Sequence, residues 1–390
     1  MHLRKTIAFV LFFCLLAFAC KKDQNSSSSG QTDNCQIQKK TSSGDIVTDE
    51  YIVAYKPSFV NARTMSIDRI SRLNQDVLQR NNIQSNSVEK TFQGEPGGFI
   101  AHLSADEAVK LKDDSDIEAI EPDRVVALST CFTVAAPTLL TWNIKRVGYG
   151  DGTGKTAWII DTGIDFTHPD LTVDQTRSKS FISGVTSASD ENGHGTHVAG
   201  IIGAKNNTFG VMGVASGATL VSLRVLDKDG DGLLSNIITA LGYVNTNASA
   251  GDVVNMSLGA DSISSILDQQ VKNTALRGVY ITIAAGNDGK PASDYSPGRA
   301  NGSNIFTVSA IDSLDNFASF SDYGNDVVDY AAPGVHILST YIGGKYAYMT
   351  GTSMAAPHVA GLLLLKGNNL STSGTAKNDP DGTPDPIAHY

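Results

Sequence analysis

Short apolar runs separated by helical segments are the feature that most constrains the fold of this chain. They are continuous stretches of apolar and β-branched residues at 157–160, 218–225, 252–256, 279–284 and 305–310. Helical patterns lie at 198–202, 234–244, 263–277 and 354–366. Runs without alternation are typical of parallel strands buried on both faces. The sequence therefore predicts an α/β fold with a mainly parallel sheet flanked by helices, and ligands at the carboxyl ends of its strands. Residues 367–390 are turn-rich and show no periodicity.

The N-terminal sequence is typical of an export signal. A basic start is followed by an uninterrupted apolar run at 7–19, which is too short for a membrane-spanning helix and suits a signal peptide. The residues before Cys20 resemble a bacterial lipoprotein box, in which the cysteine receives a lipid; an ordinary signal peptide cleaved beside Ala19 is the alternative. We expect residues 1–20 to be the signal and 21–48 a flexible tether. The protein is then exported, either as an envelope lipoprotein anchored through Cys20 or as a secreted protein.

Residues 49–129 carry a second pattern. Strands are expected at 51–55, 87–92, 99–103 and 117–120, with helices at 61–81 and after Ser104. Ser104 and Glu107 form a capping-box pattern, and Pro122 is expected to end the last strand. The order strand, helix, strand, strand, helix, strand predicts a small ferredoxin-like α/β domain.

Composition excludes some classes of function. The 390 residues exceed one average domain, and a net charge of −10 argues against a nucleic-acid partner bound through its phosphates. Four cysteines are too few to cross-link a fold of this size. Cys35 and Cys131 could pair in an oxidising envelope, and that pairing is left open.

Three motifs at strand ends or helix starts carry candidate catalytic groups. Asp161 follows a buried strand, His194 opens a helix within Asn192-Gly193-His194-Gly195, and Ser353 opens another within Gly351-Thr352-Ser353-Met354. A serine hydroxyl is a poor nucleophile unless a base lies within reach, and the base needs an acceptor that fixes its tautomer. Asp161, His194 and Ser353 can supply acceptor, base and nucleophile.

These motifs, in this order, resemble the subtilisin-like serine peptidases (subtilases) over residues 50–366. The segments 337–344 and Tyr295-Ser296-Pro297 resemble the proteinase K branch, and Gly98-Phe99-Ile100-Ala101 resembles the inhibitor-type propeptide of the family. The resemblance implies a subtilisin-like peptidase domain at 135–390 behind a propeptide and inhibitor domain at 49–129. It also implies cleavage of the junction within 130–138.

The resemblance assigns further site residues. Ala284-Ala285-Gly286-Asn287 matches the oxyanion segment, so Asn287 would donate to the oxyanion beside the Ser353 amide. Extended substrate would add as a strand between two segments, and an apolar pocket would receive the residue before the scissile bond. The implied substrate-binding residues are Gly230, Asp231, Gly232, Ser257, Leu258, Gly259, Ala284, Ala285 and Gly286.

Metal sites are weaker candidates. His194 and His197 lack the spacing of a zinc peptidase, and Asp227–Gly232 lacks the glutamate that would complete an EF-hand loop. The chemistry needs no cofactor. The resemblance offers Asp329 as a structural calcium ligand, with carbonyl groups near Ser303 and Ile305.

The sequence thus predicts an exported serine endopeptidase that acts through an acyl-enzyme and is made as a self-processing zymogen. Its partners would be extended polypeptides and its own propeptide as intramolecular inhibitor. Two alternatives on the same fold remain: a non-catalytic peptide-binding pseudo-peptidase and a peptide-joining transferase.

Overall fold

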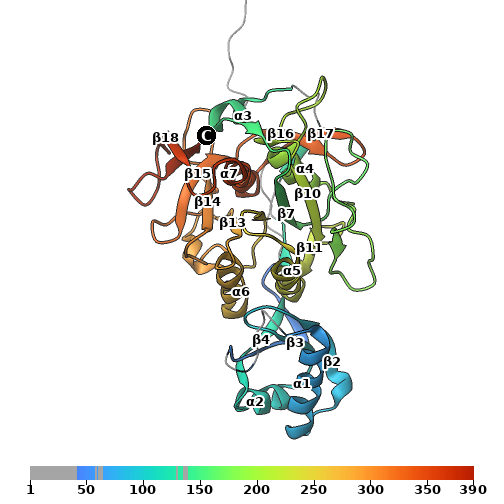
Figure 1. The fold of residues 1–390 in the computed structure, drawn as a ribbon. Helices are drawn as coiled ribbons and strands as arrows, with labels where there is room; N and C mark the ends of the chain where they lie inside the picture. Colours follow the sequence, from blue (N-terminus) through green and yellow to red (C-terminus); the bar gives the residue numbers. More distant parts are fainter. Residues whose placement is uncertain (1–41, 58, 60–64, 129–130, 135–138) are drawn as a thin grey trace, which may run out of the picture. The chain divides into compact units, whose positions relative to one another are not determined.

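The computed structural model describes residues 42–57, 59, 65–128, 131–134 and 139–390 (Figure 1). The predicted signal and Cys20, Cys35 and most of the tether lie outside the described residues. Within them, no helix is long and apolar enough to cross a membrane.

A nine-stranded sheet forms the centre of residues 139–390, in the order β18-β19-β15-β14-β13-β12-β7-β10-β8. Every neighbouring pair is parallel except the antiparallel pair β18 and β19. The strands are β7 (Thr156–Asp161), β8 (Lys179–Ser180), β10 (Thr219–Arg224), β12 (Val253–Met256), β13 (Tyr280–Ala284), β14 (Ile305–Ile311), β15 (Val328–Pro333), β18 (Ser371–Thr375) and β19 (Pro386–His389). This confirms the predicted α/β fold with a mainly parallel sheet.

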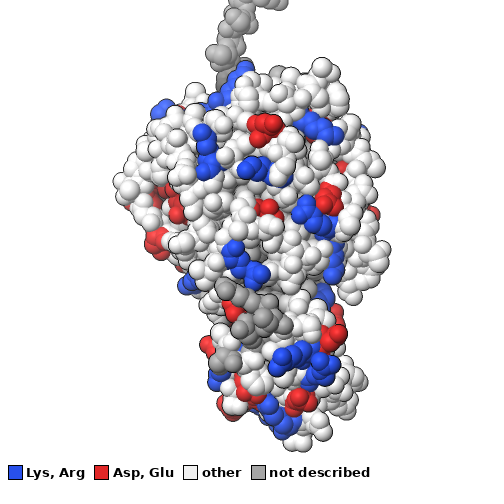
Figure 2. All heavy atoms as spheres, in the orientation of Figure 1, with Lys and Arg blue, Asp and Glu red and all other residues white. Residues whose placement is uncertain are grey.

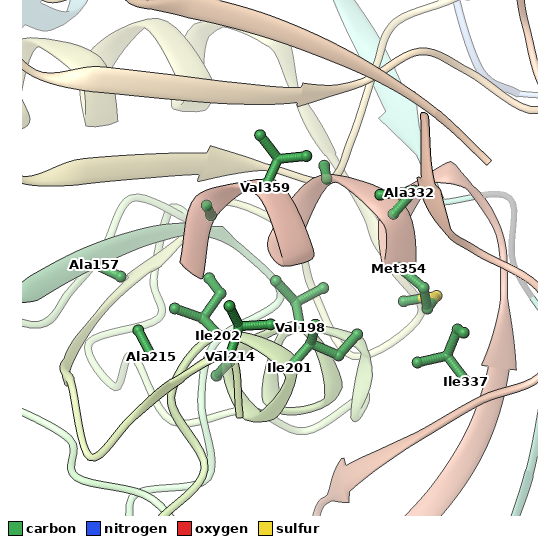
Figure 3. Packing of buried hydrophobic residues seen from close by; sticks show 14 of the residues in the cluster. Ala157, Val198, Ile201, Ile202, Val214, Ala215, Ala332, Ile337, Met354 and Val359 are labelled. Carbon is green, nitrogen blue, oxygen red and sulfur yellow. The ribbon is translucent and has the colours of Figure 1, made fainter. Parts of the chain in front are cut away.

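Helices cover both faces of this sheet. Along β7 the side chains alternate: Ala157 and Ile159 join one apolar cluster, and Trp158 and Ile160 join another. The first cluster includes residues of α4 (His194–Gly203) and α7 (Thr352–Lys366), with α3 (Trp142–Val147). Figure 3 shows Val198 and Ile202 of α4 between the ribbons of α4 and α7. The second includes α5 (Leu234–Asn247) and α6 (Ser265–Ala275). Burial on both faces explains the unbroken apolar runs.

The C-terminal tail contains two strands although its sequence shows no periodicity. Residues 367–390 contain β18 and β19, and β19 joins the parallel sheet beside β15 through the pair Ala331 and Ile387. Ile387 and Ala388 are fully buried. Two adjacent apolar residues are too few to show periodicity, so only the tertiary pairing with β15 makes this segment a strand.

A smaller three-stranded sheet shares no strand with the main sheet. It consists of β16 (Ile337–Tyr341), β17 (Lys345–Thr350) and β5 (Cys131–Val134), with β17 in the centre and both pairings antiparallel. The short strands β6 (Gly150–Asp151) and β9 (Ala215–Ser216) form a separate parallel pair.

Residues 46–127 form the predicted ferredoxin-like unit. Its strands β1 (Ile46–Tyr55), β2 (Val88–Phe92), β3 (Gly98–His102) and β4 (Ile117–Ala127) lie in the order β4-β1-β3-β2 and carry α1 (Ile67–Arg80) and α2 (Ala105–Lys112). The capping box is confirmed: the Ser104 hydroxyl accepts from the Glu107 amide, and Glu107 accepts from the Ser104 amide.

Pro122 does not end the last strand, contrary to expectation. β4 continues to Ala127, because its later residues pair with β11 (Asp231–Leu233), a strand of the larger unit. Pro122 is paired with Tyr51 next to a register shift of β1, where a missing amide donor is tolerated.

Two carboxylates of β4 cap the helices on one face of the main sheet. Glu121 accepts from the backbone amides of Ser265 at 2.9 Å and Ile266 at 3.3 Å, at the start of α6. Asp123 accepts from the backbone amide of Ser235 at 3.1 Å, at the start of α5, which has no side-chain cap of its own. A negative charge at a helix N-terminus is favourable, so these contacts hold β4 against the two helices.

Charged residues of both signs are mixed on the face drawn in Figure 2. Lys and Arg side chains there lie among Asp and Glu side chains over both the small unit and the large one. The charge of this face is thus dispersed rather than collected over one element.

The burial of the tail can be tested by truncating one side chain. Ile387 is 0% exposed and packs against Ile311, Ala331 and Ala376, whereas Leu314 is 68% exposed. We expect Ile387→Ala to lower the free energy of unfolding by about 2–5 kcal/mol, because it leaves a cavity. Leu314→Ala, the control, should change it by less than about 0.5 kcal/mol. Equal effects of the two substitutions in denaturant unfolding would contradict the placement of β19.

Candidate active site

The candidate catalytic residues lie where the order of the parallel strands reverses. From β7 the chain passes first to β8 and β10 on one side and later to β12 and β13 on the other. Asp161 ends β7, Ser257 follows β12, and Asn287 comes three residues after β13. Because the strands are parallel, these ends lie on the same edge of the sheet, where α/β proteins bind their ligands.

Asp161 and His194 form a buried pair. His194 Nδ1 lies 2.7 Å from Asp161 Oδ1, and the two residues are 1% and 0% exposed, with the histidine given first. The Thr162 amide also donates to Asp161 Oδ1, at 2.7 Å. A proton on Nδ1 fixes the tautomer and leaves Nε2 as the acceptor. Nε2 has no hydrogen-bond partner among the described residues, so it can accept a proton from a nucleophile.

Asp190 holds the first turn of α4 in place. Its Oδ1 accepts from the amides of Asn192 at 2.9 Å and Gly193 at 3.0 Å, and its Oδ2 accepts from the amide of Thr196 at 2.9 Å. The hydroxyl of Thr162 also donates to Asp190, at 2.9 Å, which connects this carboxylate to the strand end that carries Asp161. Asp190 thereby satisfies the amides around His194 and sets the position of the imidazole.

Sequence reasoning considered Asp190 only as a neighbour of a zinc site and missed this role. The available signal was an aspartate four residues before His194, ahead of a helix with no other acidic residue in its first turn. Gly193, the residue before the helix, has φ of +113°, and a Cβ there would overlap the Tyr341 ring.

Ser353 lies in the first turn of α7 and is 4% exposed. Its hydroxyl donates to the Ser257 carbonyl at 3.2 Å, and the Ser257 hydroxyl donates to the Ser353 carbonyl at 2.8 Å. Asn255 donates to the same Ser257 hydroxyl at 2.9 Å. These bonds tie the helix start to the end of β12. Loose nucleophile geometry is common before substrate is positioned, so the hydroxyl can turn from the Ser257 carbonyl toward a base.

Asn287 is oriented by Thr352, a residue that sequence reasoning did not single out. The amide and hydroxyl of Thr352 donate to Asn287 Oδ1 at 2.8 and 2.9 Å. Because the carbonyl end of the side chain is held on this side, its NH₂ group is directed the other way. The positive end of α7 lies beside it, so the two together suit a developing negative charge.

A pocket next to Ser353 contains most of the predicted substrate residues. Its wall includes Ser257, Leu258, Gly259, Ala284, Ala285, Gly286, Asn287 and Tyr295, together with Ala127 and Leu128. The other predicted substrate residues, Gly230, Asp231 and Gly232, are not part of this wall but contact the end of β4. β11 pairs with β4, and the Leu128 amide donates to the Gly230 carbonyl at 3.1 Å. The end of β4 therefore occupies the place predicted for extended substrate.

The other histidines near the site are buried and neutral. Burial lowers the pKa of His197 to about 3 and that of His358 to about 4. His197 Nε2 lies 2.9 and 3.0 Å from the carbonyls of Ile337 and Ala347, to which it donates. These contacts join α4 to β16 and β17 and give His197 a structural role.

No group of three or more His, Cys, Asp or Glu side chains within the described ranges could hold a metal ion. Asp329 Oδ2 accepts from the Thr307 amide at 2.9 Å, and burial raises the pKa of Asp329 to about 6. A calcium ion there would depend on backbone carbonyls, and calcium binding stays a prediction. In the loop at 227–232, Asp227 Oδ1 accepts from the amides of Asp229 and Asp231, so it stabilises the turn before β11.

Asp322 supports the segment after Asn287. Its Oδ1 accepts from the amides of Asp288 and Lys290, both at 2.9 Å, and a Cβ on Gly286 would overlap its Oδ2. The carboxylate is 1% exposed, and burial raises its pKa to about 6. Asp322 thus supports the predicted oxyanion segment 284–287 and the residues that follow it.

The pKa of Asp322 gives a prediction about pH. Because it is raised on folding from 3.8, its contribution to stability is complete below pH 3.8 and is lost as the pH rises through 6. Asp322→Asn cannot ionise, so we expect the variant to gain up to about 3 kcal/mol relative to the unmodified chain between pH 4 and pH 7. Unfolding of both proteins at each pH measures this difference. A difference that does not change with pH would contradict the raised pKa.

Comparisons with known proteins agree with this geometry. Residues 152–376 match the model of the Subtilase family, and residues 50–129 match that of Peptidase inhibitor I9. "Alkaline serine protease ver112" of Corniculantispora psalliotae is 35% identical over 327 residues, 76% of this chain and 82% of that protein. "Subtilisin BL" of Lederbergia lenta is 45% identical over 240 residues, 60% of this chain and 86% of that protein. A solved structure of "a cold adapted subtilisin-like serine proteinase" superimposes with a TM-score of 0.57 at 34% identity, covering 65% of this chain and 98% of the other. The chain belongs to the subtilase family and is a serine-type endopeptidase with an inhibitor I9 propeptide region.

Proposed function

We propose that this chain hydrolyses peptide bonds with Ser353 as nucleophile, His194 as general base and Asp161 as the acceptor that orients the base. The observation that carries the proposal is the buried 2.7 Å contact between His194 Nδ1 and Asp161 Oδ1, with Nε2 left for the nucleophile. Ser353 Oγ attacks the scissile carbonyl and transfers its proton to Nε2. The protonated imidazole then gives this proton to the leaving amine, and water hydrolyses the acyl-enzyme by the reverse sequence.

The oxyanion of each tetrahedral intermediate would be held by the Asn287 side-chain amide and the Ser353 backbone amide. The two bonds from Thr352 support this role, because they direct the Asn287 NH₂ group away from Thr352 before substrate arrives. A donor that is already in place costs no reorganisation during the reaction, which is the main source of its catalytic effect.

We also propose that the chain is a self-processing zymogen. Ala127 and Leu128, at the end of the propeptide region, line the same pocket as Ser353 and Asn287. A segment held there excludes other polypeptides until it is cut, and it is itself positioned for attack. Of the junction predicted at 130–138, residues 130 and 135–138 lie outside the described residues, so the exact bond and the domain boundaries stay predictions.

Several finer assignments rest on sequence motifs, and two of them are also supported by the lining of the pocket. Export, with either lipid attachment at Cys20 or free secretion, is supported by the apolar run at 7–19. Membership of the proteinase K branch is supported by Tyr295-Ser296-Pro297, of which Tyr295 lines the pocket. The pocket wall of Leu258 and Ala284 favours an apolar substrate residue before the scissile bond.

Loss of the nucleophile should stop both processing and turnover. We expect Ser353→Ala to accumulate as an uncut precursor on denaturing gels and to give no labelling by a fluorophosphonate, because the variant lacks the hydroxyl that attacks. The control is Ser373→Ala, at an exposed position of β18, which should process normally. Normal self-processing of Ser353→Ala would refute the nucleophile assignment.

The oxyanion donors should affect kcat rather than KM. Asn287→Ala is expected to lower kcat about 100 to 1000-fold, because it removes one hydrogen bond formed mainly in the transition state. Thr352→Val keeps the shape of Thr352 and its amide but removes the hydroxyl contact with Asn287, so we expect a smaller fall in kcat. Steady-state kinetics on fluorophosphonate-titrated enzyme measures both. An unchanged kcat for Asn287→Ala would contradict its role.

A further inference from the structure

A short segment from the end of the predicted tether binds the end of β4. The Gly44 amide donates to the Val125 carbonyl at 2.9 Å, and the Val125 amide donates to the Asp45 carbonyl at 3.0 Å. Arg124 Nη1 also donates to the Gly44 carbonyl, at 2.7 Å. We call residues 42–46 the strap, because they lead into β1 and lie along the end of β4.

The strap and β11 hold opposite edges of β4. Consecutive residues of a strand present their amide and carbonyl groups to alternate edges. Val125 uses both groups on the strap, and the Leu128 amide, three residues later, donates to the Gly230 carbonyl beside β11. Val126, between them, lies level with Gly232 of β11. The end of β4 is therefore paired on both edges just before it reaches the candidate active site.

The strap also contacts the peptidase domain beside the pocket. Ser43 lines the pocket that contains Ser353. Gly44 has φ of +85°, and a Cβ there would lie 3.1 Å from the backbone carbonyl oxygen of Asp261, which comes soon after the predicted substrate segment 257–259. The strap is exposed at its β1 end and half-buried where it meets the pocket. It thus bridges β4 and the rim of the candidate active site.

An extended substrate has no equivalent of the strap. Its backbone can pair with β11 in the same way as β4 does, so this pairing alone gives a cut propeptide no advantage over a substrate. The strap fixes the end of β4 as a strand before binding, which lowers the entropy lost on binding, and it adds its own contact with the peptidase domain. Both effects favour the propeptide over an unrelated polypeptide.

We propose that the strap is an autoinhibitory contact, which keeps the propeptide in the active site after its junction has been cut. Without the strap, β4 has only the affinity of an ordinary product strand, and substrates displace it. The proposal rests on the self-processing zymogen proposed above. It adds to that function a determinant of how long the cut enzyme stays inhibited.

Two substitutions in the full chain test the strap. Gly44→Pro removes the amide that bonds to Val125 and excludes a φ of +85°. Arg124→Met removes the side-chain bond to the Gly44 carbonyl and keeps the backbone. Denaturing gels follow cutting of the junction, and hydrolysis of a short fluorogenic peptide follows the appearance of free active sites. The lag between the two signals measures how long the cut propeptide inhibits.

We expect both variants to be cut at the rate of the unmodified chain but to show a shorter lag. A net hydrogen bond contributes about two- to ten-fold, so the lag should shorten at least about two-fold for Arg124→Met. Gly44→Pro disturbs more than one bond and should shorten it about ten-fold. Lys112→Met, which removes a cation at an exposed position of α2, is the control and should leave the lag unchanged.

The two signals separate failure of the strap from failure of the zymogen function. A lag equal to that of the unmodified chain in both variants would overturn the proposal. If the unmodified chain is cut but shows no lag, the cut propeptide does not inhibit and the strap has no such role. If the unmodified chain is not cut at all, self-processing itself fails. Should Gly44→Pro misfold and stay uncut, Arg124→Met, with its backbone intact, decides the outcome.

Discussion

The parallel pairing of β7 with β10 on one side and β12 on the other is the constraint on which the site depends. In this register Asp161 is level with Arg224, and Ile160 is level with Met256, so the loops after β7 and β12 begin at the same edge. α7 is buried against this sheet in the same apolar cluster as α4 (Figure 3). Its burial delivers Ser353 to the edge where Asp161 and Ser257 already lie. Residues from distant parts of the sequence thereby meet at one edge of the sheet.

A second set of side chains makes that edge rigid. Asp190 bonds the amides before and after His194, Thr352 bonds the Asn287 carbonyl oxygen, and Asp322 bonds the amides that come after Asn287. None of the three has to touch a substrate to act. Each satisfies buried polar groups whose loss would cost about 1–3 kcal/mol apiece, so the candidate catalytic groups are held before substrate binds.

The propeptide region uses two different kinds of contact. Glu121 and Asp123 bind helix starts, where the positive end of the helix meets a carboxylate. Beyond them, β4 pairs with β11 as an added strand and reaches the pocket beside Ser353. The first contacts hold the domain against α6 and α5, and the second bring its C-terminal end to the pocket that contains Ser353. The proposed self-inhibition depends on this second kind of contact.

The sequence by itself determined the fold class and the candidate catalytic groups. Runs such as 157–160 are unbroken because both faces of the strand are buried, and the capping box of Ser104 and Glu107 is a local hydrogen-bond pattern. Motifs around Asp161, His194 and Ser353 could be recognised because the chemistry demands particular residues beside glycines and helix starts. These features depend on residues that are close in the sequence, so the local sequence is enough to predict them.

Other features were decided only by the tertiary structure. β19 has two buried apolar residues and becomes a strand because β15 offers an edge, and β4 passes Pro122 because β11 pairs with the later residues of that strand. The roles of Asp190 and Thr352 depend on which amide or carbonyl lies opposite, and β5 depends on the edge that β17 offers. Strand edges and buried polar groups are paired with backbone groups that the fold brings close from distant parts of the chain. The local sequence therefore does not predict which partner each of them has.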